Sequence, residues 1–274
     1  LGIPAEPLFR SMMVVAPLSV ALPAGAADLA DRIAAAMVPL SPALVLLFGM
    51  PAAGLAPLSA ELRARLGAGC QIVGCSSAGE IGPEGYCQDT VVALGFPAAS
   101  FRVGTCVLGD QAQVPVSGWM GMLRRLHGEF RPDLRRSCFG VLLADALARH
   151  EDVLAATLDA AMPGLPVIGA STAMGLGFEQ SAIVVDGQAH PGAAVFLLLE
   201  TDLTVAELSF SHFSPTGRRA VVTAADPPNR IILELNAEPA AQEYARLAGI
   251  PESAMTPTEF DSHPLLLRAG RRDH

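Results

Sequence analysis

The chain has 274 residues, enough for two compact lobes, and 51% of them are hydrophobic, enough for a large buried core. Its net charge of −9 disfavours nucleic acid and anionic membranes as partners. No apolar run reaches the roughly 18 residues of a membrane span, and all 18 basic residues are arginines, which excludes lysine chemistry such as a Schiff base or a Walker-type phosphate loop.

The first apolar segment, residues 12–22, admits two interpretations. With Arg10 before it and the small residues 24–26 after it, the segment imitates a secretory signal peptide with its cleavage site. The alternative is a buried strand, a turn at 23–25 and a helix that starts at Asp28. We favour the alternative, because residues 28–37 have helical spacing and acids in the first turn.

The five cysteines are an odd number at irregular spacings, without a CxxC pair. A disulfide framework would favour an even set. We therefore expect free thiols and a reducing, cytoplasmic location. Cysteines scattered in this way also predict no metal cluster.

The segment IVGCSSA at 72–78 has a counterpart 95 positions later, VIGASTA at 167–173. The same shift aligns predicted strands and helices: 44–48 with 139–143, and 58–66 with 153–161. Each copy continues with two apolar runs, which we interpret as an antiparallel hairpin: 91–96 with 101–103, and 194–199 with 203–205. The pattern predicts a layered α/β fold with mixed sheets, made of two strand–helix–strand–hairpin repeats at about 10–120 and 121–212.

The pattern changes near residue 213, so we expect residues 1–212 to form one region and 213–274 a partial α+β segment. Turn residues at 214–217 come first. Short strands and a helix follow, predicted at 220–223, 230–235 and 240–248. The last apolar run, 265–267, resembles a strand without a partner. We expect this segment to be truncated, and to mediate self-association through Leu265 or Leu267.

The glycine-flanked serines at the end of the strand near 72–76 have several explanations. The pattern Gly74-x-Ser76-x-Ala78 is close to the nucleophile elbow of serine hydrolases. However, the second copy repeats it, and two elbows in one chain have no evident use. A phosphate loop needs a helix directly after the turn, which Pro83 and Gly85 disfavour. Small residues also allow a strand to pack closely against its neighbour.

Our preferred interpretation is a ligand pocket formed by the ends of both predicted strands. Ligands in α/β sheets bind at the carboxyl ends of strands, and hydroxyl groups both donate and accept hydrogen bonds. The first motif also carries one acid, whose counterpart in the second copy is Gly175. The predicted ligand-binding residues are Ser76, Ser77, Glu80, Ser171 and Thr172. No catalytic residue and no metal ligand is assigned.

Several short segments follow one another in a recognisable order: 74–80, 89–94, 169–172, 185–187 and 192–195. Further segments come later in the chain: 222–223, 229–235, 239–240, Tyr244 and 263–265. The first group resembles the N-terminal part of the FIST sensory domain, and the second is similar to the beginning of the FIST C-terminal part. The resemblance spans nearly the whole chain.

The resemblance implies a sensory domain rather than an enzyme, with a small polar ligand such as an amino acid. Its signal would pass to a separate protein such as a histidine kinase. Some members of the family are regarded as haem-binding nitric-oxide sensors, which makes haem the main alternative. Haem ligation requires a histidine in an apolar pocket, and the three considered are His190, His212 and His263. We expect no cofactor, since loop histidines are more often surface residues.

Overall fold

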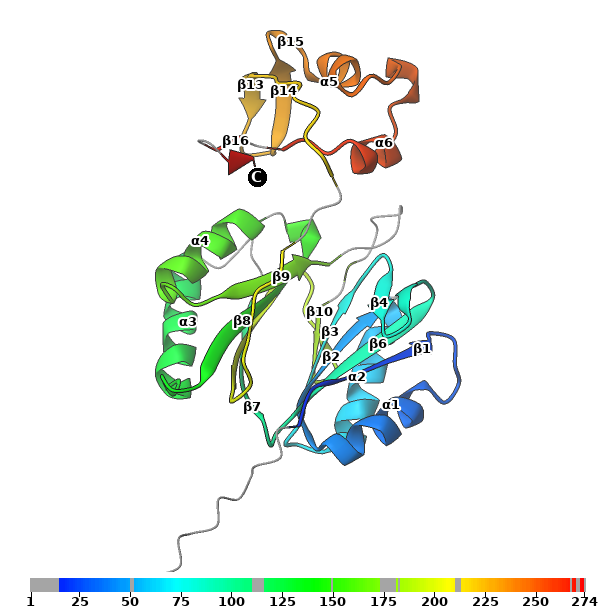
Figure 1. The fold of residues 1–274 in the computed structure, drawn as a ribbon, viewed down its shortest axis with the longest axis vertical. Coiled ribbons are helices and arrows are strands. Elements are labelled where there is room, and N and C mark those ends of the chain that lie inside the picture. The colour runs from blue at the N-terminus through cyan, green and yellow to red at the C-terminus, as the bar shows by residue number, and fades with distance from the viewer. Residues whose placement is uncertain are drawn as a thin grey trace, which may run out of the picture. The chain divides into compact units, whose positions relative to one another are not determined.

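The computed structural model describes residues 15–49, 52–109, 116–148, 150–172, 181, 183–209, 213–266, 268–269 and 272–273. The chain divides into two compact units, Leu1–Glu207 (unit 1) and Leu208–His274 (unit 2). Unit 1 contains two large sheets and their covering helices (Figure 1). The expected segments that lie outside the described residues are 1–14, together with Gly175, His212 and Leu267.

The first sheet of unit 1 has six strands in the order β1-β6-β2-β3-β10-β11. Their bounds are β1 Leu18–Pro23, β2 Pro42–Gly49, β3 Gln71–Ser76, β6 Thr90–Pro97, β10 Ile183–Val185 and β11 Gln188–Ala189. Strands β2 and β3 are parallel, and all the other neighbours are antiparallel. A small separate hairpin, β4 Glu80–Gly82 with β5 Gly85–Cys87, follows β3.

The second sheet has four strands in the order β7-β12-β8-β9. Their bounds are β7 Phe101–Leu108, β8 Ser137–Ala144, β9 Val167–Ser171 and β12 Ala194–Thr201. All eight residues of β12 are buried. This agrees with its nearly continuous apolar sequence, because an interior strand covered on both faces has no solvent side.

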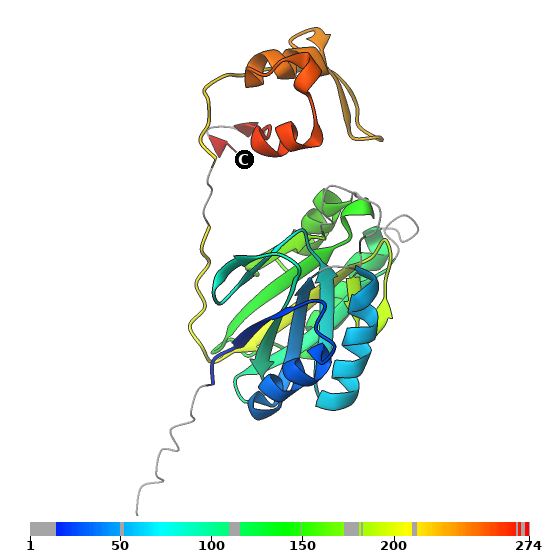
Figure 2. The ribbon, with the colours of Figure 1, turned by 90° about the vertical axis from the view of Figure 1, so that its right-hand side faces the viewer.

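Four layers build unit 1, with the two sheets face to face and a helix pair on each outer side (Figure 1). The helices are α1 Leu29–Met37, α2 Ala52–Leu66, α3 Val116–Phe130 and α4 Glu151–Ala161, with short 3₁₀ turns at Val38–Leu40 and Ala146–Ala148. Helices α1 and α2 lie in front of the first sheet in Figure 2. This architecture confirms the predicted layered α/β class.

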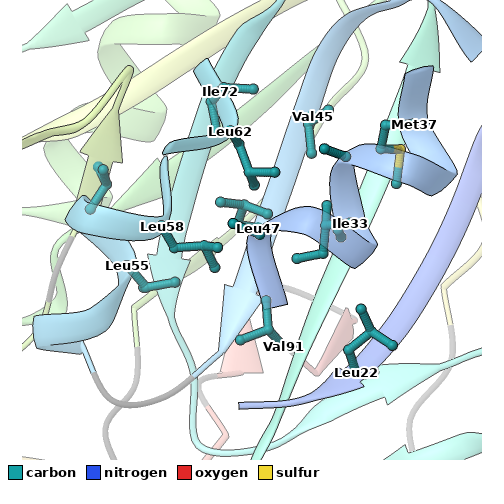
Figure 3. Close-up of a cluster of buried hydrophobic side chains, with 14 of the residues drawn as sticks. Leu22, Ile33, Met37, Val45, Leu47, Leu55, Leu58, Leu62, Ile72 and Val91 are labelled. Atoms are coloured by element: carbon teal, nitrogen blue, oxygen red, sulfur yellow. The ribbon is translucent and has the colours of Figure 1, made fainter. Parts of the chain in front are cut away.

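Three apolar clusters hold the layers together. In one, Ile33 of α1 and Leu62 of α2 pack on Val45 and Ile72 of the first sheet (Figure 3). A second, which includes Leu46 and Leu197, fills the space between the sheets. The third joins α3 and α4 to the outer face of the second sheet. The apolar positions on the interior strands β2 and β12 therefore alternate between a helix layer and the facing sheet, whereas the edge strand β9 is exposed.

The segment with two interpretations forms strand β1 from Leu18, a turn at 24–25 and then helix α1, with Asp28 at the N-cap. The predicted order of strand, turn and helix is therefore confirmed for residues 18–37. The predicted burial of the strand is wrong, because β1 lies at the edge of its sheet and only Leu22 is buried.

The two sheets share one strand order, which places β2 and β8 in equivalent positions. β1-β6-β2-β3 and β7-β12-β8-β9 each contain two antiparallel pairs followed by a parallel pair. By this strand order the second repeat begins with β7, at Phe101, and not near residue 121 as predicted.

The predicted hairpins do not form. Strand β6 already has β1 and β2 as neighbours, so it has no free edge, and β7 pairs along its full length with β12 in the other sheet. In the second copy, residues 203–205 are not a strand, and Leu203 packs instead against the cluster between the sheets.

Unit 2 contains a small sheet of β13 Val222–Asp226, β14 Ile231–Leu235 and β15 Glu238–Pro239, followed by α5 Ala240–Ala248. Asn236 and Ala237 join β14 to β15, and both have positive φ, as a two-residue type I′ turn requires. Gly249 ends α5 at φ 80°, as predicted. The short helix α6 Pro257–Ser262 and the strand pair β16 Arg268–Ala269 and β17 Arg272–Asp273 complete the unit.

The predicted strand over residues 265–267 is wrong for Leu265 and Leu266, which have no regular structure and are 57% and 51% exposed.

Nearby, the buried Tyr244 donates a hydrogen bond from its hydroxyl to the carbonyl of His263 at 2.9 Å and stacks on Phe260. Two of the segments that carry the family resemblance, Tyr244 and 263–265, therefore meet in the fold.

Candidate functional site

The glycine of each repeated motif allows two parallel strands to lie close together. Gly74 on β3 is paired with Leu47, and a Cβ built on it would lie 3.3 Å from the Leu47 Cβ. Gly169 on β9 is paired with Leu142 in the same way, and a Cβ there would overlap the Leu142 carbonyl oxygen. Close packing therefore explains the glycine of both motifs without any catalytic role.

The first motif ends β3 and places Ser76, Ser77 and Glu80 close to one another. Ser76 is 1% exposed and Ser77 is half-buried. The Ser77 Oγ donates a 2.6 Å hydrogen bond to the Glu80 carboxylate, which is 4% exposed. A nucleophile elbow needs a helix directly after its serine. Strand β4 follows here instead, so the geometry does not support the hydrolase interpretation.

Burial also argues against Cys75 as a nucleophile. It raises the pKa of the Cys75 thiol to about 12, so the thiolate is scarce at neutral pH. Burial raises the pKa of Cys70 to about 12 as well. All five cysteines are free thiols in the structure.

The second motif ends β9 with one buried and one exposed hydroxyl. The Thr172 backbone N–H donates to the Ala144 carbonyl at 2.7 Å, and its Oγ1 accepts a hydrogen bond from the backbone N–H of Ala146 at 3.1 Å. Thr172 is therefore attached to the end of the neighbouring strand β8. The exposed Ser171 donates a 3.3 Å hydrogen bond to the Glu151 carboxylate at the start of α4.

Directly after β8 lies Asp145, a buried acid that the sequence analysis did not select. Its carboxylate accepts hydrogen bonds from the backbone N–H groups of Leu147 at 3.0 Å and Gly192 at 2.7 Å, and from the hydroxyl of Ser181. An acid immediately after a predicted buried strand, at Ala144-Asp145, is the signal that could have identified it.

Asp145 links the carboxyl ends of strands from both sheets. Ile183 of β10 pairs with Cys75 of β3, so Ser181 and Ser77 each lie two residues beyond that pair. Ser181 donates its hydroxyl to Asp145 at the end of β8, and Thr172 at the end of β9 binds the adjacent backbone. Strand pairing and hydrogen bonds therefore connect the carboxyl ends of β3 and β8 through Ile183, Ser181 and Asp145. Thr172 connects the end of β9 to Ala146, the residue after Asp145.

A depression of about 230 Å³ lies between β1 and the β4–β5 hairpin. Its lining includes Ala21, Tyr86, Cys87 and the exposed Glu84, and none of the five predicted ligand-binding residues. The depression is smaller than the roughly 300–1,000 Å³ typical of sites for drug-sized ligands. The candidate site is therefore defined by the polar groups at the strand ends, and this depression is a separate feature.

Two of the three histidines considered for haem, His190 and His263, lie in the described residues. His190 is half-buried in the turn before β12, and its backbone N–H donates to the Ile183 carbonyl at 2.8 Å. His263 lies on the surface of unit 2, with its Nδ1 3.5 Å from the Glu259 carboxylate. Neither histidine lines the 230 Å³ depression described above.

Two other kinds of site can be assessed where the chain is described. No three His, Cys, Asp or Glu side chains in those parts form a group that could hold a metal ion. Among the same residues, no helix is both long and apolar enough to cross a membrane.

In the comparison with protein families, the model of the FIST N domain matches residues 43–238. The matched segment contains both repeated motifs, Asp145 and the first two strands of unit 2. No curated protein matches the chain.

Proposed function

The chain belongs to the FIST N domain family of small-ligand sensory domains, and from this premise we propose that it binds a small polar molecule at the carboxyl ends of β3, β8 and β9. The ligand would contact Ser76, Ser77, Glu80, Ser171 and Thr172. An amino acid is the ligand class we favour, because hydroxyl donors and a carboxylate suit a molecule that carries both charges.

The observation that carries this proposal is the meeting of three strand ends around Asp145. Polar side chains rarely gather at one buried place without a reason, because each loses its water on burial. Strand ends in α/β sheets are also the usual position of ligands. The hydrogen bonds from Ser181 and Gly192 hold the Asp145 carboxylate in a fixed position among these strand ends.

A thermal-shift screen of metabolites tests the proposal. At 100 times its Kd, a ligand that binds only the folded state adds about 2.7 kcal/mol to the free energy of unfolding. We expect at least one small polar metabolite to raise the melting midpoint, and Thr172→Val to reduce the effect. A screen in which nothing stabilises the protein would contradict the proposal.

We also propose that the signal passes through unit 2 to a separate protein such as a histidine kinase, or to a second copy of the chain. Several large apolar side chains of this unit are exposed: Val221, Ile231, Leu233, Leu265 and Leu266. Exposed apolar groups in such number favour a protein contact.

A further inference from the structure

Four acidic side chains are buried in the described parts of the chain, and their hydrogen-bond partners differ. They are Glu80, Asp145, Glu200 and Glu243. Glu200 accepts hydrogen bonds from two arginines and one backbone N–H, and Asp145 accepts three from neutral donors. Glu243 accepts hydrogen bonds from Asn236 and, twice, from Arg246.

Glu80 is the exception. Its carboxylate is 4% exposed and accepts one hydrogen bond from the described residues, donated by the Ser77 hydroxyl at 2.6 Å. No arginine or histidine in the described residues lies within ion-pair distance of it. An ionised carboxylate has about four acceptor positions, so most of the capacity of Glu80 is unused. A buried charge without a counter-ion is costly, and folded proteins rarely keep one without a function.

Among the described residues, none supplies a substitute cation near Glu80. Across the β4–β5 hairpin Glu80 is paired with Cys87, whose thiol donates to the Glu80 backbone carbonyl at 3.5 Å. The nearby Ser77, Gly79 and Cys87 are all uncharged. Glu80 belongs to no group of three side chains that could bind a metal ion in the described residues. An organic cation from outside the chain is the partner that fits.

We propose that Glu80 binds the positively charged nitrogen of the ligand, so that the ligand is an ammonium or amidinium compound. The inference rests on the proposed function and specifies the chemistry of its site. Ser77 positions the carboxylate by occupying Oε1, which leaves Oε2 for the ligand. Asp145, whose acceptor positions are mostly occupied by three donors, has a structural role in the same region.

The variants Glu80→Gln and Glu84→Gln form a matched pair for the test. Both acids belong to the same hairpin, but Glu84 is exposed and lines the 230 Å³ depression. Without added compound, Glu80→Gln is expected to melt at or above the wild-type temperature, because it removes an unpaired buried charge. A midpoint well below wild type would mean that Glu80 has structural partners, and would overturn the proposal.

The probes are the common L-amino acids, their N-acetyl derivatives, putrescine and agmatine. Their binding is measured by thermal shift and calorimetry. We expect a cationic or zwitterionic probe to bind the wild type and its N-acetyl derivative to bind at least about tenfold more weakly. Glu80→Gln should lose about tenfold or more in affinity, and Glu84→Gln should bind like the wild type.

The other outcomes separate the two proposals. If anionic or neutral metabolites stabilise the wild type, or if Glu84→Gln loses binding while Glu80→Gln keeps it, the cation proposal is wrong and the sensory function stands. If neither these probes nor the wider metabolite screen stabilises the protein, both proposals fail. The comparison with N-acetyl derivatives uses the wild type alone, so it tests whether the ligand must carry a positive charge even if a variant does not fold.

Discussion

Replacement of Glu200 by glutamine tests whether a buried ion-pair network secures one end of the second sheet. Glu200 is fully buried near the end of β12. One carboxylate oxygen accepts hydrogen bonds from Arg102 at 2.8 Å and Arg136 at 3.0 Å, and the other accepts one from the Asp133 backbone N–H at 2.6 Å. Arg102 also stacks on the ring of Phe130, 4.5 Å from its centroid.

The expected cost follows from burial. Removal of one partner from a buried ion pair costs about 3–5 kcal/mol, because the other charge stays buried and unpaired. The side chains of Arg102 and Arg136 are 48% and 20% exposed, so water can partly solvate them after the change. We therefore expect a loss near the lower end, about 3 kcal/mol, and a fall in Tm of about 6–12 °C for a unit of this size.

Urea unfolding followed by tryptophan fluorescence measures this loss in unit 1 alone. The chain has one tryptophan, Trp119, which is 2% exposed on α3. The control is Asp202→Asn, which removes a 45% exposed partner of Arg136 and should cost less than about 1 kcal/mol. If Glu200→Gln were no more destabilising than this control, the buried network would not carry the stability assigned to it.

Three further predictions follow from other contacts. Gly169→Ala should lower the free energy of unfolding by about 1–3 kcal/mol in the same urea assay, since a Cβ there overlaps the Leu142 backbone. Gly74→Ala should cost less, because its nearest contact is 3.3 Å away, and equal losses would contradict the packing argument. Hydrogen bonds from Arg246, and then from Asn236, lower the pKa of Glu243 from 4.5 to about 2, so the stability it contributes is present above pH 4.5 and is lost as pH falls toward 2. Circular-dichroism melts across this range should show a weaker acid dependence in Glu243→Gln than in the wild type, and unchanged curves would refute the assignment. Leu265→Glu should shift any self-associated protein toward monomer in analytical ultracentrifugation, whereas a wild type that is already monomeric at high concentration would refute self-association through Leu265.

The sequence was most informative where a local pattern determines structure. The run of apolar residues at 194–199 predicted a buried strand, and the acids and spacing after Asp28 predicted helix α1, because burial and helix propensity act over a few residues. The motif serines were correctly placed at a strand end for the same reason. Close packing was one of the explanations offered for the glycine beside them, but its partner, Leu47, is visible only in the fold.

Long-range pairing was predicted less well. The hairpin of β6 with β7 looked reasonable from two adjacent apolar runs, but sheet membership depends on which edges other strands have already occupied. Asp145 was missed because its partners Ser181 and Gly192 lie 36 and 47 positions away in the chain. The lack of an arginine or histidine partner for Glu80 among the described residues is also a tertiary property, since it depends on which side chains the fold brings together.

The most direct test of the sensory function is hydrogen–deuterium exchange with and without the strongest stabiliser from the metabolite screen. The account predicts slower exchange in peptides that contain residues 74–80, 144–147 and 167–172, at the ends of β3, β8 and β9. Slower exchange confined to the depression between β1 and the β4–β5 hairpin, or to unit 2, would contradict the assignment of the ligand to these strand ends.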